Sequence, residues 1–187
     1  MDAEFGSHVC RRAGNRWRSI TSPLLTATLE TRRTQPAANA DNCGANFCRW
    51  IVARKLRDQE KLPRYFAKSR AGDRRTSLEN ATGTQHQLRK QALTVEGASA
   101  DAVRSTLMGL EGVGVRIYWQ KIADMLPDGL AFEGRYPHGP SDAVNAALSY
   151  EYGILYSHVR GVVMNAGLEL FAGFLHVEGI GNPVAGS

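Results

Sequence analysis

The longest helical pattern in the chain covers residues 142–166, and it constrains the fold more than any other feature of the sequence. Asp142 is a suitable N-cap and Gly167 a suitable C-terminal glycine for a helix of this length. One stripe at helical spacing is apolar: Val144, Leu148, Leu155, Val159, Val162 and Val163. A second stripe is polar: Asn145, Ser149, Tyr152 and Tyr156. Because buried hydroxyls and amides need partners, the polar stripe either lines a functional groove or ties helices together.

Other segments of the chain also favour helices. Residues 47–70 predict a helix that Pro63 kinks or splits, with Trp50, Tyr65 and Phe66 assigned to the core. Residues 71–99 predict a weak helix from near Ser77 and a loop around Gly97. Two further helices are expected over 100–108 and 113–126, separated at Gly109. Residues 24–33 suit a short strand or a helix start, and 34–46 a loop. The expected fold class is therefore mainly α.

The charge is divided unevenly along the chain. Residues 1–100 hold 18 Lys/Arg and 9 Asp/Glu, a net of +9, whereas residues 101–187 hold 5 and 9, a net of −4. A basic half favours a polyanionic partner, of which nucleic acid is the commonest, although a solvated helix face is the alternative. The basic residues taken as candidate contacts to DNA phosphates are Lys55, Arg57, Lys61, Arg64, Arg116 and Arg135. The acidic half suits either a divalent metal or a solvated surface.

Cysteine content and hydropathy indicate a cytoplasmic protein. The three cysteines are an odd number, too few for a disulfide framework, and Cys43 and Cys48 lack the second pair of a zinc site. No apolar run reaches the ~18 residues that span a bilayer. The first seven residues are typical of a cloning remnant. We expect reduced thiols and no membrane partner.

Residues 107–116 support two interpretations. Gly112-Val-Gly114, followed by Arg116, fits a helix-hairpin-helix, whose turn offers backbone N–H groups to a DNA phosphate. Such a module binds DNA without catalysis. Alternatively, Glu111 is the functional group, and a carboxylate at a helix start, near a distant histidine, can form half of an Mg²⁺ or Mn²⁺ site.

Several short motifs occur in the order and approximate spacing of one known family. The motifs are Gly109-Leu-Glu-Gly112 with Arg116 and Tyr118, Phe132-Glu-Gly-Arg135, Asp142-Ala-Val-Asn145 through Tyr150, Tyr152-Gly-Ile-Leu-Tyr156, Ala166-Gly-Leu168 and Gly173-Phe-Leu-His176. A basic segment at 51–59 adds to them. Over roughly residues 105–183 the chain resembles the CRISPR-associated adaptation integrases, the Cas1 family of DNA endonucleases.

The resemblance implies a fold and a chemistry. The family has an almost wholly helical larger domain after a small N-terminal β-domain. It binds Mg²⁺ or Mn²⁺ through a Glu, which falls on Glu111, a His, which falls on His176, and a later Asp. Family members form homodimers, act with the small partner Cas2, cut branched DNA, and join the 3′-OH of captured DNA to a CRISPR array by transesterification.

The chain departs from the family pattern at both ends. The acidic Asp-x-x-Asp/Glu segment expected after His176 is missing before Ser187, where Glu178 is the only later carboxylate. Most of the β-domain also has no counterpart. We therefore expect residues 1–40 to be a short irregular or β remnant and linker, and 41–187 a truncated helical domain with little activity of its own.

Overall fold

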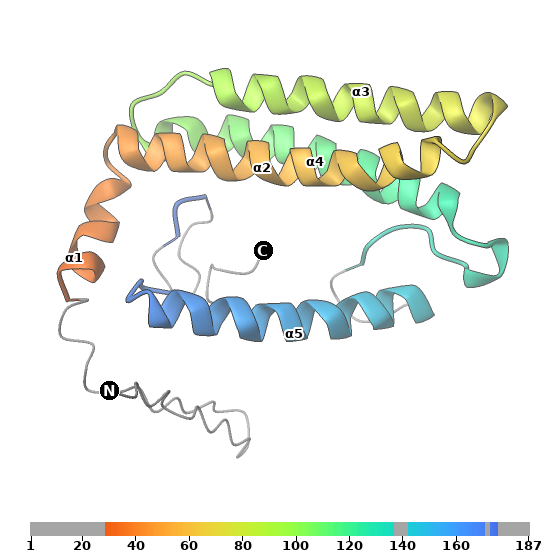
Figure 1. Ribbon diagram of the computed structural model, residues 1–187. Coiled ribbons are helices and arrows are strands. Elements are labelled where there is room, and N and C mark those ends of the chain that lie inside the picture. Colours follow the sequence, from red (N-terminus) through yellow and green to blue (C-terminus); the bar gives the residue numbers. More distant parts are fainter. Residues whose placement is uncertain (1–28, 137–141, 171–172, 176–187) are drawn as a thin grey trace, which may run out of the picture.

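The computed structural model describes residues 29–136, 142–170 and 173–175 (Figure 1). In chain order these residues form α1 (Leu29–Ala38), α2 (Asn42–Ala67), α3 (Gly72–Thr94), α4 (Ala100–Met125), the short 3₁₀ helix η2 (Asp128–Leu130) and α5 (Ala143–Asn165). No strand occurs among them, which confirms the mainly α fold class. The cloning remnant assigned to the first seven residues lies outside the described residues.

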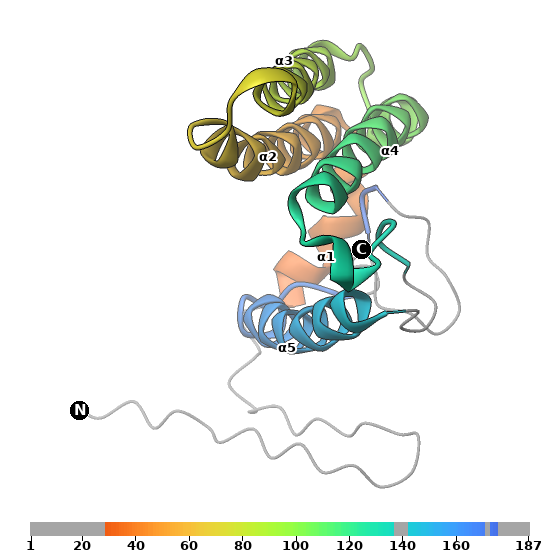
Figure 2. The ribbon, with the colours of Figure 1, turned by 90° about the vertical axis from the view of Figure 1, so that its right-hand side faces the viewer.

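Helices α2, α3 and α4 pack into one group, with α2 and α4 running in the same direction and α3 against them (Figure 1). Viewed along the helices, the three form a triangle (Figure 2), and α5 runs apart from them and alongside α2, with α1 at one end (Figure 1). The core lies inside the triangle. Its fully buried members include Cys48 and Leu56 of α2, Ala92 of α3, and Val103 and Leu107 of α4.

The large aromatic residues of α2 lie on the surface rather than in the core. Trp50 is 57% exposed and Tyr65 is 67% exposed. The buried face of α2 consists mostly of small residues instead: Gly44, Ala45, Cys48, Val52, Ala53 and Leu56. Because α2 contacts two helices at once, small side chains on this face allow the close approach, and the bulky ones face solvent. The prediction that Trp50 and Tyr65 belong to the core was wrong.

Helix α4 is continuous from Ala100 to Met125, so the predicted break at Gly109 does not exist. The glycines have another use. A Cβ on Gly114 would lie 2.2 Å from Cδ2 of Leu56, whereas Gly109 and Gly112 face open space. Gly114 thus allows α2 and α4 to touch. Without a turn at 112–114, the helix-hairpin-helix interpretation is excluded, and Glu111 lies in mid-helix rather than at a helix start.

The segment 34–46 is mostly helical, although its Pro, Asn and Gly content predicted a loop. Helix α1 continues to Ala38, and α2 begins at Asn42, capped by the Asp41 carboxylate. The side-chain amide of Gln35 accepts a bond from the Glu169 N–H (2.8 Å) and donates one to the Glu169 carbonyl (3.0 Å). Residues 29–38 are therefore a helix that holds the chain after α5, not an irregular or β remnant.

Helix α5 has the predicted ends. The Asp142 carboxylate accepts a bond from the Asn145 N–H at 2.8 Å, and Gly167 adopts a φ of +74° after the last turn. The apolar stripe is only partly covered, since Leu155 is 55% exposed and Val162 is 67% exposed. None of the helices in the described part of the chain has the length and hydropathy needed to cross a bilayer.

Candidate functional site

The contact between α2 and α4 places two predicted site residues side by side. Leu56 of α2 fills the space left by Gly114 of α4. Lys55 precedes Leu56 in the chain, and Glu111 lies one turn before Gly114. Their side chains form an ion pair, in which the Lys55 ammonium donates a hydrogen bond to Oε1 of Glu111. The close approach of α2 and α4 at Leu56 and Gly114 therefore brings the two side chains within reach of each other.

The two members of this pair differ in exposure. The Glu111 side chain is 20% exposed and the Lys55 side chain 41%. Each has the other as the only hydrogen-bond or ion-pair partner recorded among the described residues. Glu111 is thus the more buried member of the pair and Lys55 the more exposed.

A third helix fixes the turn of α4 that follows Glu111. Gln85 of α3 is 1% exposed, and its amide donates a 2.7 Å hydrogen bond to the Gly114 carbonyl. The side-chain oxygens of Gln85 and Gln59 are both buried next to Gly114 with no hydrogen-bond partner among the described residues. Gln85 could not be identified from the sequence, because a glutamine in a polar stretch of Thr, Gln and Asn carries no signal of burial.

The segment that leads toward His176 runs along the same two helices. The Phe174 ring packs on Phe47 of α2 with centroids 5.0 Å apart, and its carbonyl accepts bonds from Arg104 of α4 at 3.1 and 3.3 Å. Phe47 and Arg104 each lie about two turns before Lys55 and Glu111 on their own helices. His176 itself lies outside the described residues.

The donor chemistry of this region suits a hard divalent cation only in part. Glu111 offers carboxylate oxygens, which such cations prefer. No cluster of three His, Cys, Asp or Glu side chains able to hold a metal occurs in residues 29–136, 142–170 and 173–175.

The predicted DNA-contacting residues of α2 share an exposed face. Arg57, Lys61 and Arg64 are spaced four and three residues apart, and Lys68 continues the row. Two of them are already in ion pairs: Lys61 with Asp58 (2.6 Å) and Arg64 with Glu60 (3.1 Å). Arg57 is exposed and forms no ion pair within the described residues.

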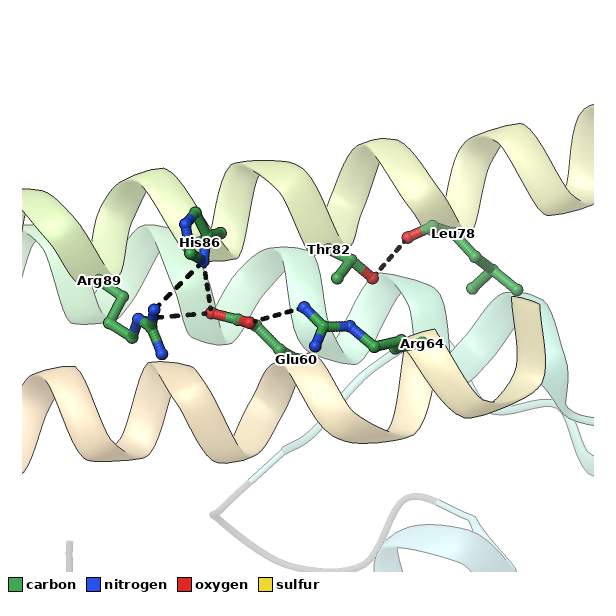
Figure 3. Close-up of polar contacts among 6 residues, drawn as sticks. All are labelled: Glu60, Arg64, Leu78, Thr82, His86 and Arg89. Atoms are coloured by element: carbon green, nitrogen blue, oxygen red, sulfur yellow. Dashed lines mark hydrogen bonds and ion pairs between the residues drawn. The ribbon is translucent and has the colours of Figure 1, made fainter. Parts of the chain in front are cut away.

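A buried carboxylate lies between α2 and α3, close to this basic row. Glu60 is 3% exposed and faces Arg64, Arg89 and His86, as Figure 3 shows. The Arg89 Nε and His86 Nδ1 atoms lie 3.8 Å from Glu60 Oε1. One buried acid thus faces Arg64 of α2 and Arg89 of α3. Nothing in the sequence pattern indicated its burial.

Arg116 and Arg135 occupy different places. Arg116 is exposed on α4. Arg135 donates hydrogen bonds to the Tyr136 carbonyl (2.9 Å) and to Oδ1 of Asn145 (3.1 Å), and lies over the Tyr152 ring. Arg135 is thus largely engaged within the protein.

The polar stripe of α5 divides in the structure. Asn145 is fully buried and also accepts a bond from the Tyr136 N–H (2.9 Å) and donates to the carbonyl of Gly134 (2.9 Å) and to Oδ2 of Asp142 (2.7 Å). Ser149 and Tyr156 are half-buried, and Tyr152 is 47% exposed. Asn145 therefore ties residues 134–136 to the start of α5.

Comparison with known proteins gives consistent matches. The family model described as CRISPR associated protein Cas1 matches residues 1–184. The chain is 36% identical over 163 residues to the CRISPR-associated endonuclease Cas1 of Hyperthermus butylicus, covering 85% of this chain and 46% of that protein. It is 31% identical over 168 residues to CRISPR-associated endonuclease Cas1 1 of Archaeoglobus fulgidus, covering 85% and 48%.

A solved structure has the same fold. A chain of the "Partial Cas6-RT-Cas1--Cas2 complex" superposes with a TM-score of 0.70 at 24% identity, covering 91% of this chain and 49% of that one. The chain therefore spans about half the length of the curated relatives that it matches.

Proposed function

This chain belongs to the family of CRISPR associated protein Cas1, and on that premise we propose that it supplies the DNA-binding and metal-binding helices of a CRISPR adaptation endonuclease and integrase. In this proposal residues 41–187 form the working domain and residues 1–40 lead into it. The reaction is the insertion of captured DNA into a CRISPR array by transesterification.

The observation that carries the proposal is the meeting of Lys55 and Glu111 on parallel helices. DNA cleavage and strand transfer need a cation that attracts a phosphate and a carboxylate that holds a metal, close together. The contact of Leu56 with Gly114 brings such a cation, Lys55 of α2, next to such a carboxylate, Glu111 of α4. Arg57, Lys61 and Arg64 add a row of positive charge on another face of α2, as further contacts to a DNA backbone. Arg116 adds a contact from α4, and Arg135 a contact from the 134–136 segment.

Glu111 and His176 would hold Mg²⁺ or Mn²⁺. The bound cation would act as a Lewis acid on the scissile phosphate. Lys55 then binds a neighbouring phosphate oxygen, and Gln85 keeps the Glu111 turn in place through the Gly114 carbonyl. In this proposal Ser149, Tyr152 and Tyr156 of α5 line a groove for the DNA, and Asn145 holds residues 134–136 beside it. A DNA 3′-OH attacks the phosphodiester, one P–O bond forms, and another breaks to release a new 3′-OH.

The partners follow from the same premise. We propose branched or spacer-like DNA as the substrate, a homodimer as the working unit, and a small protein of the Cas2 kind as a partner. The matched solved structure, a chain of the "Partial Cas6-RT-Cas1--Cas2 complex", supports the last of these. The site of action is the prokaryotic cytoplasm, where the DNA substrate is found.

A cleavage and strand-transfer assay on branched DNA with Mn²⁺ tests the proposal, comparing the chain with Glu111→Ala. Activity that the substitution abolishes supports a metal site that includes Glu111. Salt-sensitive DNA binding without activity limits the chain to the binding half of the proposal. Absence of both refutes it.

A further inference from the structure

One exposed face of α2 carries a continuous row of cationic side chains, which we call the outer row. Its members are Arg54, Arg57, Lys61, Arg64 and Lys68, and the exposed Trp50 precedes them on the same face. The spacing alternates between four and three residues, which keeps all six on one face of the helix over a length of about 27 Å. Lys55 lies about 140° further round α2, on the flank that meets α4. The outer row is therefore separate from the Lys55–Glu111 pair.

Two acids hold members of the outer row in place without neutralising the row. Asp58 forms ion pairs with Lys61 (2.6 Å) and Arg54 (3.0 Å). The buried Glu60 accepts a hydrogen bond from Arg64 at 3.1 Å (Figure 3). The other two cations form no ion pair in the part of the chain that the structure describes. Five cations against two acids leave an excess of positive charge on this face, which attracts a polyanion.

The outer row ends at a hollow of about 220 Å³ between α2 and α3. The residues that line the hollow are Arg64, Ala67, Lys68, Arg75, Glu79 and Thr82. Ala67 and Thr82 are buried, and the Thr82 hydroxyl already donates a 2.9 Å hydrogen bond to the Leu78 carbonyl within α3 (Figure 3). The other four lining residues are exposed, and three of them are cations. The hollow thus has small buried residues inside and positive charge around them.

The opposite end of the outer row carries an exposed aromatic ring. Trp50 is 57% exposed, and the described residues include no ring that packs on it. An indole beside cations stacks well on a nucleobase, provided that the face of the base is free. Duplex DNA covers the faces of its bases, whereas a single strand presents bases and phosphates together. An indole, a row of cations and a small hollow on one face therefore fit a single strand better than a duplex.

We propose that the outer row of α2, with Trp50 at one end and the hollow at the other, binds single-stranded DNA. The cations hold phosphates, the Trp50 ring stacks on one base, and the hollow takes another base against Ala67 and Thr82. This inference deepens the proposed function by naming the form of DNA at this face, and it rests on that function because it needs DNA as the ligand. One chain then holds a single strand here and a separate DNA segment at the Lys55–Glu111 face.

The first test concerns Trp50 and uses fluorescence anisotropy with a short oligothymidylate and with a blunt duplex of the same length. Trp50→Ala is expected to weaken single-strand binding about five- to a hundredfold, the equivalent of stacking on one base, and duplex binding less than about twofold. Trp50→Phe keeps a ring and is expected to recover most of the loss. Tyr150→Ala removes a similarly exposed ring from α5 and is the control.

Three results of this first test overturn the inference. One is an equal loss of single-strand affinity from Trp50→Ala and Tyr150→Ala. Another is a loss on the duplex as large as that on the single strand. The third is no recovery in Trp50→Phe, since a stacking contact needs only an aromatic ring. Circular dichroism of each variant checks that the helices are kept.

The second test concerns the hollow and uses two neighbouring arginines of α3. Arg75→Gln is expected to weaken single-strand binding about three- to tenfold, because Arg75 lines the hollow. Arg74→Gln removes an equal charge from an exposed residue that does not line it, and is expected to weaken binding less than about twofold. Equal losses from the two substitutions overturn the assignment of the hollow to the strand.

Failure of the proposed function looks different from failure of this inference. If the unaltered chain binds neither the single strand nor the duplex, the proposed function fails, and the inference fails with it. If the chain binds the duplex but Trp50→Ala leaves single-strand binding unchanged, only the inference fails.

Discussion

Gly114 of α4 lies so close to α2 that a Cβ on it would come within 2.2 Å of Cδ2 of Leu56, a residue with no exposed surface. The same Cβ would lie 3.0 Å from the side-chain oxygen of Gln85 on α3. Three helices therefore meet at one glycine, and the Lys55–Glu111 pair lies one turn from that point. Placement of the candidate site depends on this meeting.

Gly114→Ala is expected to destabilise the protein by about 1–3 kcal/mol, because the added methyl group overpacks a core that is already filled. Urea unfolding measures the change. Gly112→Ala is the matched control, since nothing lies within 4 Å of its Cβ position. There the gain in helix propensity is expected to stabilise by up to about 1 kcal/mol. Equal effects at the two glycines would contradict the close contact.

Glu60→Ala is expected to cost about 2–4 kcal/mol of unfolding free energy. Removal of this buried carboxylate leaves Arg89 and His86 without the acid that they face (Figure 3). Glu79→Ala is the control, because the Glu79–Arg75 pair at 2.7 Å is exposed on both sides. We expect less than about 0.5 kcal/mol there. If Glu60→Ala lowers the free energy of unfolding no more than Glu79→Ala does, the contacts of Glu60 contribute nothing to stability.

Asn145→Ala is expected to loosen residues 134–136, because it removes the hydrogen bonds of the Asn145 side chain with Gly134, Arg135 and Tyr136. Hydrogen exchange at the Tyr136 amide, which donates to Asn145 at 2.9 Å, reports the change. We expect exchange to speed up by about tenfold or more, because a lost buried bond costs about 1–3 kcal/mol. Ser149→Ala, one turn further along α5, should leave this amide unaffected.

Arg57→Ala is expected to weaken DNA binding to all sequences alike and to reduce the slope of log affinity against log salt by about one. Arg57 is exposed and has no ion pair to break in the described part of the chain. Anisotropy at a series of salt concentrations gives the slope. Loss of affinity for one sequence but not for another would argue against a phosphate contact.

Cys48 is expected to resist alkylation. Burial raises the pKa of its thiol, with Arg104 and Arg49 opposing the shift only in part. Since the thiolate is the reactive form, a raised pKa lowers its fraction at any given pH, and the pH at which Cys48 reacts moves upward. Mass spectrometry after iodoacetamide treatment should show Cys43, which is exposed, modified first. Faster labelling of Cys48 in the folded protein would contradict its burial.

The sequence alone was enough for the local features of the chain. Helix α5 could be predicted to within a residue, because Asp142 caps its start and Gly167 ends it through interactions with neighbouring residues. The mainly α class followed from helical spacing, and the family from the order of short motifs. Each of these depends on residues a few positions apart, or on a pattern kept along the chain.

Tertiary structure decided which glycine ends a helix and which lets two helices touch. Gly109 and Gly114 both look like helix-ending residues in the sequence, yet both lie inside α4. The hydrogen bonds and packing of this long helix outweigh the cost of its three glycines. It also decided that Trp50 faces solvent, that Glu60 and Gln85 are buried, and that Lys55 meets Glu111. Burial and ion pairing join residues far apart in the sequence. They depend on how closely helices pack, which no single segment of the sequence contains.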